Sequence, residues 1–431
     1  MARYLLAATP IYGHVAPLLA IGRHLTARGH DVTFLTGSRF HGAVDATGAR
    51  HVSLHGKADY DDRRLAEAFP DRARYEPGPA QLAFDVRHLF GDAIPAQDAG
   101  LRDILRTWPA DAVLVDMLFM GAFPSLLDPS AAHPPIVAFG IAPVVLSSQD
   151  TAPYGSALPP DASPEGRARN TALHRHLQDD LLAPTQAYID DLLGAHGWRP
   201  LPYFVLDALY RLPDLFLQLT AASFEYPRSD APASLHFIGP LPPAPSDAFT
   251  PPPWWGELEA ERPVVVVTQG TFGNADLGEL IGPTLTALAD LDVTVVATTG
   301  GAPLSAIPVA LPANGWAAEF IPFDQLLPRA DLLVTNGGYG GVNQALGFGV
   351  PLVVAGDGED KPEIAARVAW AGAGINLGGK HPAPEQIRAA VQAVLTEPRY
   401  RERAHAARVD FARHHPFDEI DDALMGLVTG S

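Results

Sequence analysis

Residues 332–355 of the chain read LLVTNGGYGGVNQALGFGVPLVVA. The stretch opens on a short apolar run at 332–335, passes through a glycine-rich turn, continues into an expected helix at 340–347 and ends on a second apolar run at 351–355. Short continuous apolar runs are typical of parallel strands that are covered on both faces. The stretch therefore predicts a strand, a helix and a strand, which is the repeating unit of an open parallel sheet.

The same alternation extends outward from this unit in both directions. The expected strands lie at 3–9, 31–36, 112–116, 136–141, 264–268 and 293–298, and further helices of the second half are expected at 277–291 and 362–371. Between the first two strands a helix with apolar residues at helical spacing is expected to end at Gly29. Two doubly wound α/β sheets, one in each half of the chain, follow from this pattern.

A change of composition separates the two halves. Prolines stand at positions 227, 232, 240, 242, 243, 245, 251, 252, 253 and 263. Such a density of proline predicts a stiff connector between domains. We therefore expect an N-terminal domain over 1–225, a linker over 226–262, a C-terminal domain over 263–412 and a last amphipathic helix within 413–431 that packs back on the N-terminal domain.

Length and charge narrow the class of protein. The 431 residues exceed the size at which one core stops growing, which supports two domains. The net charge of -19 argues against nucleic acid and anionic lipid as partners, and the absence of cysteine excludes disulfides, thiolate metal sites and a cysteine nucleophile. No apolar stretch reaches the length of a membrane span, and the first residues do not follow a signal-peptide pattern, so we expect a cytoplasmic protein.

Two polar residues follow the ends of expected strands in the first half. His14 comes after the first strand, within a Pro/Gly turn, and Asp116 ends the buried run at 112–116. Open α/β sheets bind ligands beyond the carboxyl ends of their strands, and a carboxylate paired with an imidazole fixes its tautomer for proton removal. The alternatives are that His14 starts a helix and that Asp116 caps one.

Two turns in the second half are suited to an anionic, hydroxyl-rich ligand. Residues 335–341 combine a glycine-rich turn with a helix N-terminus, whose N–H groups can meet a diphosphate. The turn lacks the dinucleotide G-x-G-x-x-G pattern after the first strand and the P-loop lysine, which disfavours those two classes. Residues 349–362 place acidic residues and Lys361 between a strand and a helix, which is either a grip for hydroxyls or a solvated turn.

Taken together, these segments resemble the family 1 glycosyltransferases of the GT-B fold, a group that includes bacterial macrolide glycosyltransferases. The resemblance covers most of the chain. Its marks are Gly13–Pro17 followed by Gly29–Phe34, then Phe237–Leu241, then the long signature from Phe320–Pro322 through Asn336–Gly338 and Gly349–Pro351 to Asp360–Lys361. It implies two Rossmann-like domains facing each other across a cleft, with nucleotide sugar held by the second domain and acceptor by the first.

By this resemblance His14 is the general base of an inverting transfer and Asp116 is its partner. Phe320 falls where the family stacks an aromatic ring on the nucleobase, Ile321 offers it backbone groups, and Asp360 falls on the carboxylate that binds sugar hydroxyls. The remaining expected donor residues are Gly270, Thr271, Asn336, Gly337, Gly338, Tyr339, Gly340, Gly341, Gln344 and Lys361. The expected acceptor residues are Ile11, Tyr12, Phe84 and Phe90, for which ordinary core packing is the alternative.

Several positions depart from the family pattern. Asn336 replaces a common histidine, Gln344 a common glutamate, Lys361 a common glutamine and Ile364 a common asparagine. These changes all fall on donor contacts, so we expect an altered sugar or nucleotide preference within the class of UDP- or TDP-hexoses. The resemblance implies no metal and no cofactor besides this co-substrate; Asp61 and Asp62 are expected to form a solvated acidic loop.

The expected partners are a nucleotide sugar and a small natural-product acceptor, bound by a monomer or a homodimer. Two other functions stay open on the sequence. One is a catalytically silent auxiliary protein of the same fold, against which the retention of His14 and Asp116 counts. The other is a nucleotide-sugar epimerase, which would turn over donor with no acceptor present.

Overall fold

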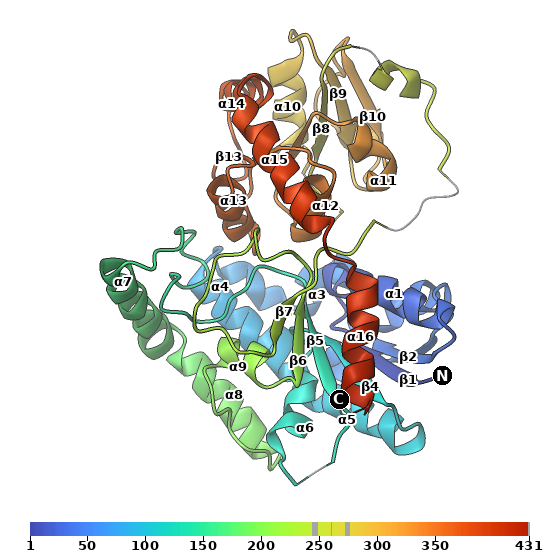
Figure 1. Cartoon of the computed structure of the whole chain (residues 1–431), viewed down its shortest axis with the longest axis vertical. Coiled ribbons are helices and arrows are strands. Elements are labelled where there is room, and N and C mark those ends of the chain that lie inside the picture. Colours follow the sequence, from blue (N-terminus) through green and yellow to red (C-terminus); the bar gives the residue numbers. More distant parts are fainter. Residues whose placement is uncertain (131, 244–248, 260, 272–275, 430–431) are drawn as a thin grey trace.

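The computed structural model describes residues 1–130, 132–243, 249–259, 261–271 and 276–429. The chain forms two α/β halves, each built on its own parallel sheet, and the two halves lie one above the other in Figure 1. The predicted class, with two doubly wound sheets, is confirmed.

The sheet of the first half has seven strands in the spatial order β3-β2-β1-β4-β5-β6-β7, and all neighbours are parallel. The strands are β1 (Arg3–Ala7), β2 (Asp31–Thr36), β3 (Arg50–Ser53), β4 (Ala112–Asp116), β5 (Ile136–Gly140), β6 (Leu215–Gln218) and β7 (Leu235–Phe237). The helices are α1 (Tyr12–Ala27), α2 (His41–Asp45), α3 (Leu65–Ala68), α4 (Pro79–Phe84), α5 (Ile94–Thr107), α6 (Phe123–Leu127), α7 (Pro164–Arg175), α8 (Ala183–Ala195) and α9 (Val205–Arg211).

The sheet of the second half has six parallel strands in the order β10-β9-β8-β11-β12-β13. They are β8 (Val264–Thr268), β9 (Thr294–Thr298), β10 (Gly315–Ala318), β11 (Leu332–Thr335), β12 (Leu352–Val354) and β13 (Gly374–Asn376). The helices are α10 (Ile281–Leu288), α11 (Phe323–Leu326), α12 (Tyr339–Gly347), α13 (Lys361–Trp370), α14 (Pro384–Thr396), α15 (Pro398–Phe411) and α16 (Pro416–Thr429).

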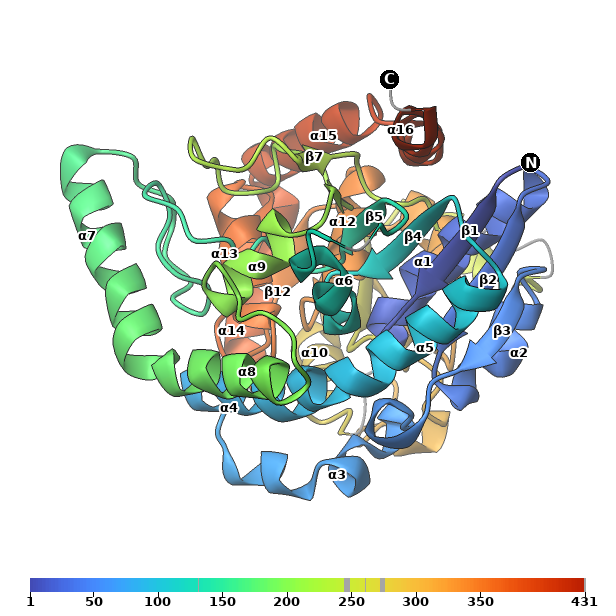
Figure 2. The ribbon, with the colours of Figure 1, turned by 90° about the horizontal axis from the view of Figure 1, so that it is seen from below.

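Apolar side chains cover both faces of each sheet, which explains why the strands read as unbroken apolar runs. In β1, Leu5 and Ala7 join the core on one face while Tyr4 and Leu6 join the core on the other. Seen from below, α5 and α8 lie on one side of this sheet and α16 on the other (Figure 2). The second sheet is enclosed in the same way by two further clusters.

The last helix, α16, leaves the second half and packs on the first. Ile420 and Leu424 are fully buried in the core that α1 also lines. The Phe417 ring stacks on His24 with 4.7 Å between ring centres, and the Asp421 carboxylate accepts from His24 Nε2 at 3.0 Å. In Figure 1 this helix lies beside α1, so the chain crosses between the halves a second time.

The segment predicted as a linker, 226–262, is more structured than a spacer. Its Leu235–Phe237 forms β7, the edge strand that pairs with β6. Prolines flank this strand without interrupting it, which an edge position tolerates. Farther on, the Trp254 ring stacks on Trp316 of β10 at 5.8 Å, which attaches the end of the segment to the second half. The sequence-based boundary at 226 is therefore early for the sheet.

Candidate active site

Each sheet reverses its strand order at one point, and the candidate residues follow the strands on either side of it. In the first sheet this point lies between β1 and β4, in the second between β8 and β11. His14 lies in the first turn of α1, shortly after β1, and Asp116 is the last residue of β4. Ligands of doubly wound sheets bind in the crevice at such a point.

His14 and Asp116 are in direct contact. The Nδ1 atom of His14 lies 2.8 Å from Oδ1 of Asp116, and the carboxylate is fully buried while the imidazole stays 14% exposed. Asp116 also accepts the backbone N–H of Leu118 at 2.8 Å and of Thr9 at 2.7 Å. Because an ionised carboxylate only accepts, this contact favours the neutral tautomer of His14 that carries its proton on Nδ1 and leaves the lone pair on Nε2.

Aromatic residues lie beside the imidazole. The ring of Phe90 stacks on His14 with 6.1 Å between ring centres and is largely buried. Tyr12, at the start of α1, is 45% exposed, and Ile11 is partly buried next to it. Phe84 is also buried, with its ring 4.9 Å from that of His88. Of the four expected acceptor residues, Phe90 is the one whose ring contacts His14, while the ring of Phe84 contacts His88.

The glycine-rich turn of the second half lies at the β8/β11 reversal point. Gly270 follows β8 with a φ of 71°, and Gly337 follows β11 with a φ of 92°. A methyl group on Gly337 would meet Val354 Cγ1 at 2.8 Å, so a side chain fits there neither by conformation nor by space. Gly338 and Gly340 open onto empty space, which leaves the backbone at the start of α12 accessible to a ligand.

The polar side chains of this turn are placed differently from one another. Asn336 donates its amide to the carbonyl of Gln269 at 2.5 Å, which joins the turn after β11 to the turn after β8. Thr271 is exposed, Gln344 is partly buried on α12, and Gly341 lies near the ring of Phe323. Asn336 therefore shapes the turn and keeps its carbonyl oxygen and its second amide N–H for other partners.

Phe320 and Ile321 follow β10, at the outer edge of the same sheet. The Phe320 side chain is 63% exposed, while Ile321 is buried in the core beneath it. A large exposed aromatic ring next to an anchored neighbour is suited to stacking on a flat ring of a ligand. This is the placement that a nucleobase contact requires.

Asp360 and Lys361 form the start of α13. Lys361 Nζ binds Glu359 at 2.9 Å, and Asp360 is the N-terminal capping position of the helix. Burial and the neighbouring Glu359 carboxylate raise the pKa of Asp360 to about 6, while the charge of Lys361 and that of His14 across the gap oppose the rise. Asp360 of the second half thus lies within electrostatic range of the His14 imidazole of the first half when that ring is protonated.

Comparison with known proteins agrees with this geometry. Residues 283–427 match the family model for the C-terminal domain of erythromycin biosynthesis protein CIII-like proteins. Over 429 residues the chain is 42% identical to 4'-demethylrebeccamycin synthase of Lentzea aerocolonigenes, covering 99% of this chain and 100% of that protein. The chain belongs to the family 1, natural-product glycosyltransferases.

Two further relatives agree with this assignment. UDP-glycosyltransferase 2 of Phaeomoniella chlamydospora is 41% identical over 434 residues, which are 98% of this glycosyltransferase and 95% of the fungal protein. The crystal structure of the glycotransferase of kitacinnamycin superposes with a TM-score of 0.74 at 23% identity, over 99% of this chain and 98% of that one. The fold is GT-B.

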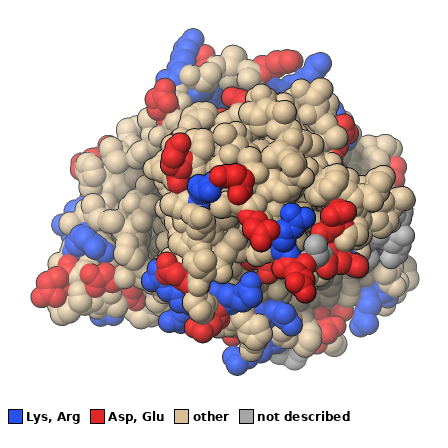
Figure 3. Space-filling model, turned by 90° about the horizontal axis from the view of Figure 1, so that it is seen from above, with Lys and Arg blue, Asp and Glu red and all other residues tan. Residues whose placement is uncertain are grey.

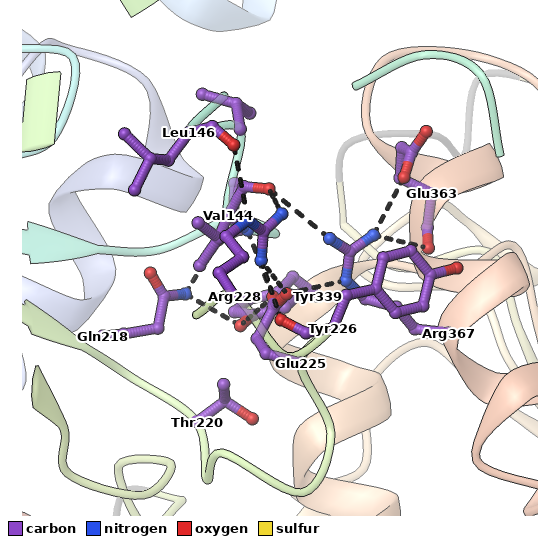
Figure 4. A network of polar contacts seen from close by, with 12 residues as sticks. Val144, Leu146, Gln218, Thr220, Glu225, Tyr226, Arg228, Tyr339, Glu363 and Arg367 are labelled. Atoms are coloured by element: carbon purple, nitrogen blue, oxygen red, sulfur yellow. Dashed lines mark hydrogen bonds and ion pairs between the residues drawn. The ribbon is translucent and has the colours of Figure 1, made fainter. Parts of the chain in front are cut away.

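One predicted donor residue of the glycosyltransferase has its side chain engaged elsewhere. Tyr339 is only 6% exposed, and its hydroxyl lies 2.8 Å from Gln218 Nε2 and 3.3 Å from Glu225 Oε1, both in the first half (Figure 4). The hydroxyl of Tyr339 therefore belongs to the junction of the halves, and its place among the donor residues stays a prediction. What Tyr339 can offer a donor is its backbone N–H in the first turn of α12.

The sequence did not single out the residues that join the two halves of the glycosyltransferase. Thr220 Oγ1 donates to Asn343 Oδ1 at 2.5 Å, and Glu225 pairs with Arg367, in each case across the junction. Glu363 and Arg367 stand four residues apart on α13, a spacing that usually indicates an exposed helix pair. Only the burial of both side chains reveals a different role.

Two general features of the described residues bear on partners. In the described ranges there is no helix long and apolar enough to cross a membrane and no group of three or more His, Asp or Glu side chains that could hold a metal ion. On the face drawn in Figure 3, basic and acidic side chains lie side by side between uncharged residues. That face presents mixed charge rather than a continuous basic surface.

Proposed function

We propose that this glycosyltransferase inverts the anomeric centre, with His14 as general base, and moves a hexose from a UDP- or TDP-hexose to a small natural product. The single observation that carries the proposal is the His14–Asp116 contact, which leaves Nε2 of a partly exposed imidazole free to accept a proton. A base of this kind is required when a neutral hydroxyl attacks an anomeric carbon directly.

In the proposed reaction the acceptor hydroxyl gives its proton to Nε2 of His14 as its oxygen forms a bond to the anomeric carbon. The bond from that carbon to the diphosphate breaks, and the nucleoside diphosphate leaves with the electron pair. Because attack and departure lie on opposite faces, the product has the opposite anomeric configuration. Asp116 stabilises the imidazolium that forms, since its carboxylate already lies 2.8 Å from Nδ1.

The donor is proposed to lie over the glycine-rich turn. The open backbone at Gly338 and Gly340 supports a diphosphate at the N-terminus of α12, where N–H groups and the helix dipole favour negative charge without a metal ion. The exposed ring of Phe320 would stack on the nucleobase, and Asp360 would accept from sugar hydroxyls. Asn336 and Gln344 are uncharged, which supports a donor preference that differs from that of relatives with histidine and glutamate there.

The acceptor is proposed to be an apolar or aromatic natural product bound in the first half. Phe90 stacks beside His14, and Tyr12, with an exposed ring, stands two residues before His14 at the start of α1. The name of the bacterial relative, 4'-demethylrebeccamycin synthase, supports an acceptor of the natural-product type.

The test is a consumption assay with UDP-glucose and TDP-glucose, run with and without a panel of polycyclic aromatic acceptors. Transfer of the sugar only when an acceptor is present supports the proposal. Conversion of the donor in the absence of acceptor would identify an epimerase instead. Binding of the nucleotides without turnover under any condition would identify a catalytically silent protein.

A further inference from the structure

The two halves are joined by a buried cluster of charged side chains, shown in Figure 4. Arg367 of α13 donates from Nε to Glu225 Oε2 at 2.9 Å and from Nη1 to Glu363 Oε2 at 2.9 Å. The three side chains are each at most 5% exposed, and the Tyr226 ring lies 4.3 Å from the guanidinium carbon of Arg367. Arg228 adds a second buried guanidinium next to Glu225, so two cations balance two carboxylates.

The cluster fastens the loops that follow β5 in the first half. Glu363 Oε1 accepts the backbone N–H groups of Gly155 and Ala157, both at 2.8 Å. Glu225 Oε1 accepts the N–H of Val144 at 3.1 Å, and Arg228 donates to the carbonyl of Val144 at 2.8 Å. Through Glu363, the first turn of the helix that starts after Asp360 is therefore tied to a loop of the acceptor half.

The 155–157 loop is held in a conformation that it would not adopt by itself. Ala157 has a φ of 50°, in the left-handed region that non-glycine residues avoid. On the facing side, Glu359 has a φ of 56° immediately before Asp360. These are the two non-glycine residues with positive φ in the described ranges, and both lie where α13 meets the acceptor half. Strain of this kind persists where the surroundings fix the backbone, and it gathers at functional sites.

A buried ionic cluster is a costly way to hold two domains together. Apolar residues of similar volume hold a buried junction at least as well, because charges lose their hydration on burial. A guanidinium between two carboxylates fixes their relative orientation, because its planar N–H groups can donate to both carboxylates in only one arrangement. The cluster therefore fixes the orientation of α13 against the acceptor half more than it strengthens the junction.

We propose that Arg367 is a positioning residue of the transfer reaction, which acts through Glu363 and the 155–157 loop to hold Asp360 at the correct place opposite His14. This rests on the proposed function, in which Asp360 holds the sugar and His14 activates the acceptor. Asp360 stands three residues before Glu363, at the N-terminal cap of α13. A shift of the first turn of α13 would therefore move Asp360, and with it the proposed sugar site, relative to His14. Phe320 has no contact with the cluster, and the α12 turn meets it through the Tyr339 hydroxyl, which lies 3.3 Å from Glu225 Oε1 and keeps this neighbour when Arg367 is replaced.

The experiment compares Arg367→Met with wild type. We expect turnover to fall by about 10- to 100-fold, as for a misplacement of about 1 Å between reacting groups, while the dissociation constant of the free nucleoside diphosphate changes less than about twofold. Turnover is measured well below the melting temperature of the variant, so that only folded protein contributes. Arg367→Lys keeps the charge but cannot bridge both carboxylates and is expected to be intermediate.

Glu363→Gln is the second variant, in case Arg367→Met does not fold. It is nearly isosteric and keeps one oxygen for the loop N–H groups, but its amide turns a donor toward Arg367. A drop in turnover with unchanged nucleotide binding is again expected. The matched control is Asp98→Asn, which removes a buried carboxylate paired with Arg102 at 2.8 Å inside the first half, away from the junction. It is expected to lower the melting temperature and leave turnover unchanged.

Two results would overturn the inference. Wild-type turnover in Arg367→Met or Glu363→Gln would mean that the cluster does not position the sugar site. A parallel loss of nucleotide affinity and turnover would mean that the cluster acts only by supporting the donor half. Both results differ from a failure of the proposed function, in which the wild type itself transfers no sugar or His14→Ala transfers it at the normal rate.

Discussion

The His14–Asp116 pair of the first half and the glycine-rich turn of the second half lie at equivalent points of two parallel sheets, yet they are built differently. Asp116 is fully buried and accepts from two backbone N–H groups and from His14. The donor turn offers open glycine backbone at Gly338 and an exposed ring at Phe320. In the proposed mechanism this difference means that the base is oriented before any substrate binds, whereas the donor site is completed by its ligand.

The largest effect is expected when the proposed base, His14, is removed. In His14→Ala we expect turnover to fall about 100-fold or more, the usual scale for a general base. The affinity for nucleoside diphosphate should stay the same, because that site lies in the other half. Steady-state kinetics and calorimetric titration of the nucleotide measure the two effects separately. A collapse of nucleotide binding would show that the two halves do not divide the work in this way.

The orientation of the base is tested by Asp116→Asn. An amide keeps one acceptor but places an N–H donor among three other donors, so we expect about 100-fold lower turnover and a loss of about 1–3 kcal/mol in the free energy of unfolding. Asp111→Asn is a matched control, since Asp111 accepts the N–H of Arg3 at 2.7 Å just before the other end of β4. Equal turnover in Asp116→Asn and the control would remove Asp116 from the mechanism.

The donor side is tested by Phe320→Ala. Loss of a stacking partner is expected to weaken nucleotide binding about tenfold, while turnover at saturating donor changes little. Leu311→Ala, at another exposed apolar residue of the same half, serves as control and should bind nucleotide normally. Unchanged affinity in Phe320→Ala would take Phe320 out of the nucleobase site.

The smallest expected effect concerns the pH dependence of sugar binding. The pKa of Asp360 is raised to about 6, so its carboxylate becomes protonated as the pH falls through that value. The neutral acid is a weaker acceptor for sugar hydroxyls, and the affinity of wild type for nucleotide sugar, relative to that of Asp360→Asn, should fall about three- to tenfold between pH 8 and pH 5. Titrations of both proteins with nucleotide sugar at each pH, without acceptor, measure this ratio, and a ratio that does not change with pH would contradict the role of Asp360.

The raised pKa of Asp360 also affects the stability of the fold, but in the opposite direction: lowering the pH weakens sugar binding and favours folding. A carboxyl group whose pKa is higher in the folded chain than the ordinary 3.8 favours folding only while it is protonated, and this contribution is lost as the pH rises through about 6. Asp360→Asn is therefore expected to melt at a higher temperature than wild type at pH 8, with a smaller difference at pH 5. A difference that grows toward pH 5 would contradict the assigned direction.

Much of the fold could be predicted because its signals are local. Unbroken apolar runs identified the buried strands, and the stretch 332–355 folds as the predicted strand, helix and strand. Strand ends also indicated where His14 and Asp116 would lie, because parallel strands end at the same edge. The short edge strand at Leu235–Phe237 was missed, since the surrounding prolines dominate the composition of that segment.

The junction between the halves could not be predicted, because its contacts join residues that are far apart in the chain. Glu363 and Arg367 have the spacing of an exposed helix pair, and nothing local indicates that Glu225, more than 130 residues earlier, completes their cluster. Tyr339 stands within the glycine-rich turn, yet its hydroxyl is oriented by Gln218 of the other half. Local patterns predict a candidate site, while long-range contacts decide where side chains such as that of Tyr339 are directed.

The central claim is a direct displacement in which His14 deprotonates the acceptor. Its most direct test is the anomeric configuration of the product, read from NMR coupling constants after transfer from a nucleotide hexose of known configuration. The mechanism predicts a product whose anomeric centre is opposite to that of the donor. A product that keeps the configuration of the donor would contradict it.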